Sequence, residues 1–284
     1  MTTPDARRIR AALDARIMNE SAGEDPYPLR RRLAYQRMLR RLSLDNDGGW
    51  VLQGGYLLEV RIDVRARATK DLDLAMRTAG SGAEVVELLQ RALAPDPDGD
   101  TFTFVVSPAT ALAEGAGGSQ AWRVTVDARL DGRTFAKLRV DLAQRLDEIG
   151  ESTEKITIEA PIHGMNLGAA VMSAVDIAQH AAEKFHALCQ IFPGARQNTR
   201  VKDLLDIILF VEASLLPDPN LPARIASVFM SRDGVLPPET LPTPPASWRE
   251  DYLLLATSTG AETTDIELAL QIAQTIFRSN TLLE

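Results

Sequence analysis

The stretch 52–76 constrains the fold more than any other part of the chain, because a glycine pair there precedes a strand that carries two acids. The pair is Gly54 and Gly55, and a helix-compatible segment separates it from the strand. Side chains alternate between the two faces of a strand, so Asp71 and Asp73 project together while the leucines beside them project to the other face. Two adjacent carboxylates repel each other unless a cation lies between them. A divalent metal that carries nucleotide phosphates is the usual solution.

Composition limits the class of protein. The chain has 284 residues, of which 45% are apolar and 25% charged, as in a globular protein of one large or two modest domains. No apolar run approaches the ~20 residues that span a bilayer, and the first residues lack the apolar segment of a signal peptide. The single cysteine, Cys189, excludes an intramolecular disulfide and a multi-cysteine zinc site. We therefore expect a cytoplasmic protein that does not associate with a membrane.

Helical and strand patterns are mixed in the first part of the chain, which predicts an α/β (α+β) domain over residues 1–165. Apolar residues at helical spacing predict helices over 5–20, 29–44 and 83–93. Alternating apolar residues predict strands near 50–52, 69–74, 102–106, 122–126 and 134–142. An Asp-Gly pair before the last of these strands is typical of a hairpin turn.

Helix-like segments and Pro-rich loops predominate from Ser173 onward, with no convincing alternating strand. The pattern predicts helices over 173–191, 199–212, 223–230 and 264–277. It therefore predicts a helical C-terminal domain over residues 166–284, which can also pack with the first domain as one unit.

The charge of the chain is unevenly distributed. A net charge of −8 argues against a protein coated for bulk nucleic-acid binding. Between Leu29 and Leu42, however, there are six arginines and no acid: Arg30, Arg31, Arg32, Arg37, Arg40 and Arg41. A solvated helix face is the more frequent meaning of such a run, and contact with RNA or phosphate is the alternative.

A third acid extends the candidate metal site. Asp141 ends the predicted strand 134–142, which has an apolar face opposite the face that carries the acid. There it could complete a site begun by Asp71 and Asp73. Taken alone, an exposed aspartate paired with an arginine is the better interpretation.

Two predicted helices add a lysine and a pair of acids. Lys184 lies in apolar company on the first helix, where a lysine either extends to solvent or holds phosphate as a point charge. Asp203 and Asp206 stand three residues apart on the next helix and share a face. Helix capping is the ordinary role of Asp203, and none of these signals is specific by itself.

In this order along the chain, the motifs resemble those of the AbiEii/AbiGii-type nucleotidyltransferase-like toxins, which include the MenT-like toxins. The resemblance spans about residues 52–209. The family's GG or GS dipeptide and R-x-T/S-x-D-x-D motif match Gly54, Gly55, Arg67, Thr69, Asp71 and Asp73. Its strand acid, its AEK-x-x-A helix and its R-x-K/R-D-x-x-D helix match Asp141, Ala182, Glu183, Lys184, Ala187, Arg200, Lys202, Asp203 and Asp206.

The resemblance implies a polymerase-β-like nucleotidyltransferase core with a mixed sheet, followed by a helical C-terminal half. It also implies the toxin of a toxin–antitoxin pair of the phage-defence type. The expected reaction is Mg²⁺-dependent transfer of a nucleoside monophosphate from an NTP to the 3′ end of tRNA. A cognate antitoxin is the expected protein partner, with a small winged-helix protein as one candidate.

The resemblance also implies roles for individual residues. Mg²⁺ would be held by Asp71, Asp73 and Asp141. The nucleotide would be bound by Gly54, Gly55, Arg67, Thr69 and Lys184. Catalysis would depend on Asp71, Asp73, Lys184, Asp203 and Asp206, with one of the last two orienting Lys184 or the acceptor. The arginine helix is then a candidate acceptor-RNA surface.

Two other functions remain open at this point. A nucleotidyltransferase acting on a small hydroxylated molecule, such as an aminoglycoside, would use the same carboxylates with a different acceptor pocket. A non-catalytic binding module would keep the fold and lose the activity. Tyr56 follows the glycines where the family often has a small residue, which keeps the second possibility open and predicts a differently shaped nucleotide pocket.

Overall fold

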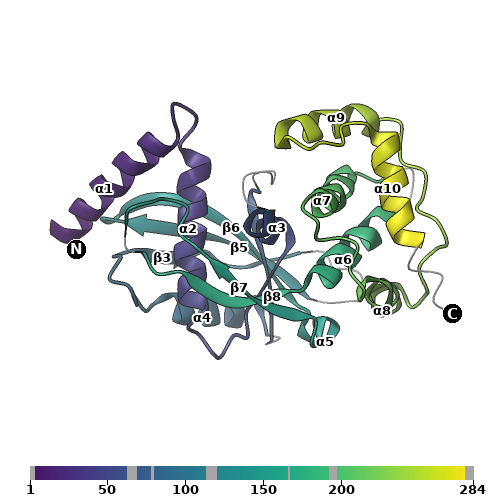
Figure 1. Ribbon diagram of the computed structural model, residues 1–284. Coiled ribbons are helices and arrows are strands. Elements are labelled where there is room, and N and C mark those ends of the chain that lie inside the picture. The colour runs from purple at the N-terminus through teal and green to yellow at the C-terminus, as the bar shows by residue number, and fades with distance from the viewer. Residues whose placement is uncertain are drawn as a thin grey trace.

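The computed structural model describes residues 4–62, 69–77, 80–112, 120–165, 167–191 and 197–278. A mixed sheet with its helices forms one side of the molecule, and a group of helices forms the other (Figure 1). The chain starts in the sheet half and ends in the helical half. This arrangement confirms the predicted fold class, a mixed-sheet core followed by a helical half.

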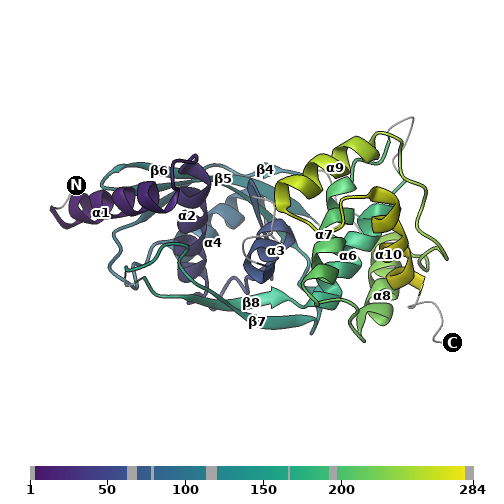
Figure 2. The same ribbon diagram turned by 45° about the horizontal axis from the view of Figure 1, so that its top comes forward.

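The sheet has eight strands, seven of them in the order β3-β5-β6-β2-β1-β8-β7, with β4 beside β5. The strands are β1 (Val51–Gln53), β2 (Asp71–Met76), β3 (Thr103–Val106), β4 (Thr110–Ala111), β5 (Ala121–Leu130), β6 (Arg133–Gln144), β7 (Thr153–Ile158) and β8 (Ala170–Val175). The helices of this half are α1 (Pro4–Glu20), α2 (Tyr27–Leu42), α3 (Gly54–Ile62), α4 (Gly82–Leu93) and the short α5 (Leu146–Ile149). The sheet curves around α2, with β5 and β6 on one side and β7 and β8 on the other (Figure 2).

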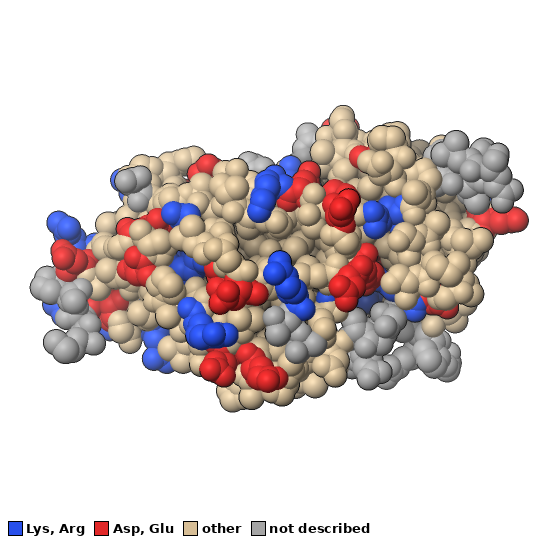
Figure 3. All heavy atoms as spheres, turned by 90° about the horizontal axis from the view of Figure 1, so that it is seen from below, with Lys and Arg blue, Asp and Glu red and all other residues tan. Residues whose placement is uncertain are grey.

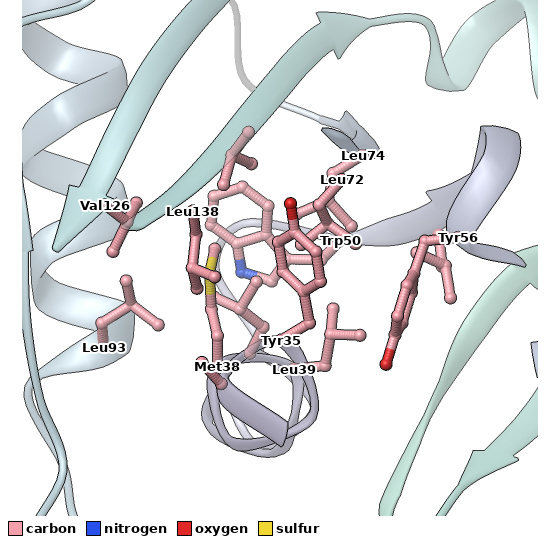
Figure 4. Packing of buried hydrophobic residues seen from close by; sticks show 14 of the residues in the cluster. Tyr35, Met38, Leu39, Trp50, Tyr56, Leu72, Leu74, Leu93, Val126 and Leu138 are labelled. Atoms are coloured by element: carbon pink, nitrogen blue, oxygen red, sulfur yellow. The ribbon is translucent and has the colours of Figure 1, made fainter. Parts of the chain in front are cut away.

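Helix α2 covers one face of the sheet. Tyr35, Met38 and Leu39 point from α2 toward the strands, where Leu72 and Leu74 of β2 meet them (Figure 4). All five side chains are almost fully buried. Because side chains alternate along a strand, burying the two leucines against α2 turns the aspartates of β2 to the opposite face.

The hairpin between β5 and β6 forms at the predicted Asp-Gly turn. Asp131 and Gly132 both have positive φ, 54° and 70°, as the tight two-residue turn requires. The turn aligns two long antiparallel strands in which Arg123 lies opposite Asp141.

Three strands, the two-residue β4 and the longer β7 and β8, were not predicted from the sequence. β8 pairs in parallel with β1, and β7 pairs with β8 at the sheet edge. The helix predicted over 173–191 is shorter, because residues 173–175 belong to β8 and α6 spans Ile177–Cys189. β8 reads as a short apolar run without clear alternation, because apolar Val171 occupies an exposed position of the strand. The sheet therefore extends beyond residue 165, and we propose that the division of the chain falls after β8.

The helical half contains α6, α7 (Val201–Glu212), α8 (Leu221–Asp233), α9 (Trp248–Thr259) and α10 (Ile266–Arg278). Helix α9 was not predicted, since it follows directly on a Pro-rich connector. The buried side chains of these helices form an apolar cluster separate from the cluster around the sheet. Leu58 of α3 belongs to this second cluster and so joins the two halves. Among the described helices, none is long and apolar enough to cross a membrane.

The arginines of α2 are mostly not a surface for RNA. Arg37 and Arg41 are buried, and the acids of the 96–100 loop surround them. Arg41 bonds Asp100 at 2.7 and 3.1 Å, and Arg40 pairs with Asp98. On the face drawn in Figure 3, positive and negative side chains are interspersed. The hypothesis of an acceptor surface on this helix is therefore wrong for its C-terminal half, because the arginines there are neutralised inside the protein.

Candidate active site

Three acids predicted from the sequence lie on one face of two adjacent strands. Asp73 of β2 is directly in register with Asp141 of the parallel strand β6, and Asp71 lies two residues before Asp73. Residues in register on neighbouring strands project to the same face, so all three carboxylates face away from α2. Gln53 of β1 lies on the other side of Asp73 in the sheet.

The carboxylate of Asp73 fits against the glycine pair. Gly54 has φ of 69°, and a Cβ at this position would collide with the Asp73 carboxylate. A backbone hydrogen bond from Gly55 also reaches Asp73. Burial, and then the negative charge of Asp141, raise the pKa of Asp73 to about 6, and Lys184 opposes them. The glycines are therefore needed for the close approach of a carboxylate whose negative charge is not balanced by its surroundings.

Two arginines on the same face bind the other two acids. Arg123 of β5 forms a two-pronged pair with Asp141, at 2.7 and 2.6 Å. Arg139 of β6 donates from Nε to Asp71. Sequence analysis did not assign these arginines to the site, although Arg139 shares a strand face with Asp141. Only the strand register could have placed them opposite the acids.

Lys184 joins the site to the helical half. Its Nζ lies 2.6 Å from Asp206 and 3.1 Å from Asp203, so both acids of α7 contact it. Lys184 and both aspartates are buried, and Asp206 is fully so. Lys184 also acts electrostatically on Asp73, which places its ammonium group within range of the acidic face. The structure thus brings together residues that are 111 positions apart in the sequence, from Asp73 to Lys184.

A buried ionic network fixes the helix that carries Lys184. Arg145, just after β6, bonds Glu183 at 2.7 Å and also contacts Glu148 and Gln53. Arg232 of α8 completes the network through Glu148 at 2.8 Å. Glu183, predicted only as part of a motif, therefore connects α6 to the end of the sheet through its ion pair with Arg145.

His180, one turn before Lys184, is structural. Its Nδ1 lies 2.7 Å from Arg61 of α3, and its ring packs against Phe210. Burial, and then the positive charges of Lys184 and Arg61, hold the pKa of His180 well below its usual value. The neutral ring links α6 to α3, which starts at the glycine pair.

The remaining predicted residues lie at the edge of the site or outside the described residues. Thr69 is buried, donates its backbone N–H to the carboxylate of Glu59, and donates its hydroxyl to the carbonyl of Asp71 at 3.3 Å. Arg67 lies outside the described residues. Tyr56 points into the core, where its ring contacts Tyr35 at 5.1 Å between centroids. The aromatic residue after the glycines thus serves packing between α2 and α3.

The acids suit a hard divalent cation in kind, because carboxylate oxygens are its preferred ligands. As the described residues are placed, however, no group of three His, Cys, Asp or Glu side chains is arranged to hold a metal ion. Arg123 and Arg139 occupy oxygens of two of the three acids, and burial, followed by the charge of Asp141, raises the pKa of the third, Asp73. The residues fit a cation once these arginines release them, and the metal assignment stays a prediction.

Comparison with known proteins identifies a family and a similar fold. The family model described as "Nucleotidyl transferase AbiEii toxin, Type IV TA system" matches residues 37–272. The fold is similar to MenT4, nucleotidyltransferase toxin Rv2826c from Mycobacterium tuberculosis H37Rv, with a TM-score of 0.55 and 18% identity over 97% of this chain and 90% of that one. JHP933 from Helicobacter pylori has a TM-score of 0.48 and 18% identity over 89% of this chain and 93% of its own. No curated protein matches the sequence.

Proposed function

The chain belongs to the AbiEii family of nucleotidyl transferase toxins, and on that premise we propose that it transfers a nucleoside monophosphate from an NTP to the 3′ end of a tRNA. Family membership makes it a nucleotidyltransferase and the toxin of a toxin–antitoxin system, with an NTP as substrate and an antitoxin as partner. The tRNA acceptor, the metal and the roles of single residues are the parts that we propose.

The observation that carries the proposal is the buried contact of Lys184 with Asp203 and Asp206 beside Asp73. The two carboxylates keep the ammonium group charged although it is buried. They also fix its position, which matters because phosphoryl transfer depends mostly on positioning and charge neutralisation. A lysine held in this way is suited to bind a triphosphate oxygen as a point charge.

In the proposed reaction an acceptor hydroxyl oxygen attacks the α-phosphorus of the NTP. The new P–O bond forms as the bond to the β-phosphate oxygen breaks, and pyrophosphate leaves. The turn at Gly54 and Gly55 lets the phosphates approach the backbone closely, and Thr69 and Arg67 complete the nucleotide-binding set. Asp203 and Asp206 hold Lys184 in place.

A divalent cation, Mg²⁺ in this proposal, would be held by Asp71, Asp73 and Asp141 and would neutralise charge on the phosphates. The proposed antitoxin is a small winged-helix protein, and the proposed biological role is phage defence. Because NTPs and tRNA are cytoplasmic, the reaction is expected in the cytoplasm.

The test is incubation with each labelled NTP, Mg²⁺ and total RNA, in parallel with a panel of aminoglycosides. Label is expected in the tRNA fraction, and Asp73→Ala and Lys184→Ala should abolish both transfer and growth inhibition. Lys155→Ala is the matched control, because this exposed lysine on β7 bonds only Ser173 among the interactions described for it. Label in an aminoglycoside instead of RNA would show that the acceptor is a small molecule and not tRNA. Transfer activity in both site variants would contradict the assignment of the active site.

A further inference from the structure

Two arginine–aspartate pairs lie across neighbouring strands at the proposed metal site. The register places Arg123 opposite Asp141 and Arg139 opposite Asp71. Arg123 engages both oxygens of Asp141, and Arg139 engages Asp71 through Nε. The two arginines therefore occupy the same carboxylates that the proposed function gives to a divalent cation.

Both pairs are open to solvent on the arginine side. The exposed fraction of the side chain is 38% for Arg123 and 46% for Arg139. Ion pairs this exposed contribute little to stability, because water screens them and each side chain loses rotamer freedom. Releasing either arginine thus costs little, whereas a doubly charged ion among three carboxylates gains much more Coulomb energy than a guanidinium.

The position of the arginines in the sheet separates them from the nucleotide side of the site. β1, which ends just before Gly54, lies on one side of β2, and β6 and β5 lie on the other. Lys184 lies on α6, which follows β8, the neighbour of β1. The glycine pair and Lys184 thus lie on the β1 side of β2, and the two arginines lie on the opposite side.

We propose that Arg123 and Arg139 are exchangeable counter-ions that hold Asp141 and Asp71 in the metal-free protein and, once released by a divalent cation, bind phosphodiester groups of the acceptor strand. A planar guanidinium matches a phosphate as well as a carboxylate, so one side chain serves both partners in turn. The inference rests on the proposed function, because it uses the metal and the polynucleotide acceptor. It adds two residues of the acceptor site that no sequence motif marks.

The first arm of the test measures Mn²⁺ binding by titration calorimetry in wild type, Arg139→Gln and Arg123→Gln. Each variant should bind Mn²⁺ roughly two- to fivefold more tightly, because a competing cation has been removed. Arg129→Gln is the matched control: Arg129 pairs with Asp127 on the same strand, with a similar exposed fraction, 43%. It removes the same charge away from the three acids, and its Mn²⁺ affinity should match that of wild type.

The second arm measures binding of a short single-stranded RNA and of a non-hydrolysable NTP, both with Mn²⁺ present. Each site variant should bind the RNA more weakly, and the salt slope of RNA binding should fall by about 1 for the lost phosphate contact. The affinity for the NTP should not change. A purely structural role for the arginines would not raise metal affinity while it lowers RNA affinity.

Each other outcome contradicts the proposal. Unchanged or weaker Mn²⁺ binding in both site variants would show that the arginines do not compete with the metal. Weaker NTP binding with unchanged RNA binding would assign the released arginines to the triphosphate. The proposed function fails separately, if wild type transfers no nucleotide to RNA, and the Mn²⁺ arm still reports on the exchange in that case.

Discussion

The protein uses arginine–aspartate pairs in two regions, and the two differ in burial. On α2, Arg37 and Arg41 have exposed side-chain fractions of 0%, and Asp100 beside them is equally enclosed. On the open face of the sheet, the side chains of Arg123 and Arg139 are more than one third exposed. The chemical groups and distances are alike, so burial is what separates them.

The difference in burial indicates which of the arginine–aspartate pairs are structural. An isolated charge left in the α2 cluster would be desolvated, so each member requires the others. The pairs on the sheet are less enclosed, because water reaches the arginines and also part of Asp141 and Asp71, whose side chains are 19% and 28% exposed. Two of the six clustered arginines, Arg37 and Arg41, are therefore structural, whereas two scattered arginines lie at the candidate site.

The largest expected effect comes from breaking the buried cluster. Arg41→Met keeps most of the side-chain volume but leaves Asp100 buried without its principal partner. We expect a loss of about 3–5 kcal/mol in the free energy of unfolding, measured by urea denaturation. The matched variant Arg123→Met should lose less than about 1 kcal/mol. Equal losses in the two variants would remove the distinction between the regions.

The next effect concerns the two acids around Lys184, which is buried like the α2 cluster but lies at the candidate site. Asp206 is fully buried and closer to the ammonium group than Asp203. Asp206→Asn should lower kcat about 100-fold and Asp203→Asn about 10-fold, as expected for charge-assisted hydrogen bonds of unequal strength. Steady-state transfer kinetics give both values. A larger loss in Asp203→Asn would reverse the assignment.

An intermediate effect on stability is expected in the network between the two halves. Burial alone would raise the pKa of Glu183, but Arg145 and Arg232 outweigh it and hold the pKa below its ordinary value. Glu148 shifts in the same direction, with burial opposed by Arg145. A carboxyl group with a lowered pKa in the folded state stabilises above its unfolded pKa, and this stability is lost as the pH falls through the folded value.

Glu183→Gln should therefore lose about 1–3 kcal/mol of unfolding free energy at pH 7. The variant should also show a smaller decline in stability than wild type between about pH 5 and pH 3, because one linked proton has been removed. Denaturant unfolding at a series of pH values measures both quantities. If the unfolding free energy of the variant fell with decreasing pH as steeply as that of wild type, Glu183 would not contribute to the loss of stability in acid.

The smallest effect is expected from the exposed pairs. A double-mutant cycle with Arg123→Ala and Asp141→Ala should give a coupling energy below about 1 kcal/mol, which falls further in 0.5 M salt. The same cycle with Arg41 and Asp100 should give several times as much and change little with salt. A strong, salt-insensitive coupling in the sheet pair would contradict easy exchange of the arginines.

Local sequence patterns predicted much of the fold and the candidate residues. Alternation placed Asp71 and Asp73 on one strand face, and the Asp-Gly pair predicted the hairpin at Asp131. Helical spacing placed Lys184, Asp203 and Asp206 on two helices. β8 was missed because apolar residues occupy exposed as well as buried positions, Val171 among them, and α9 was missed beside its prolines. An apolar residue at an exposed position removes the alternation on which prediction depends.

By itself, the sequence determined the local elements and the residues that they carry. These are a strand with two acids, a glycine turn, a lysine helix and an acid helix, all set by contacts within a few residues. The tertiary structure alone decided which of these elements meet. It placed Asp141 beside Asp73, enclosed Arg37 and Arg41, and left Arg123 and Arg139 open at the site. The reason is that the strength of an ion pair depends on register and on burial, and both are set by strands and loops that lie far apart in the sequence.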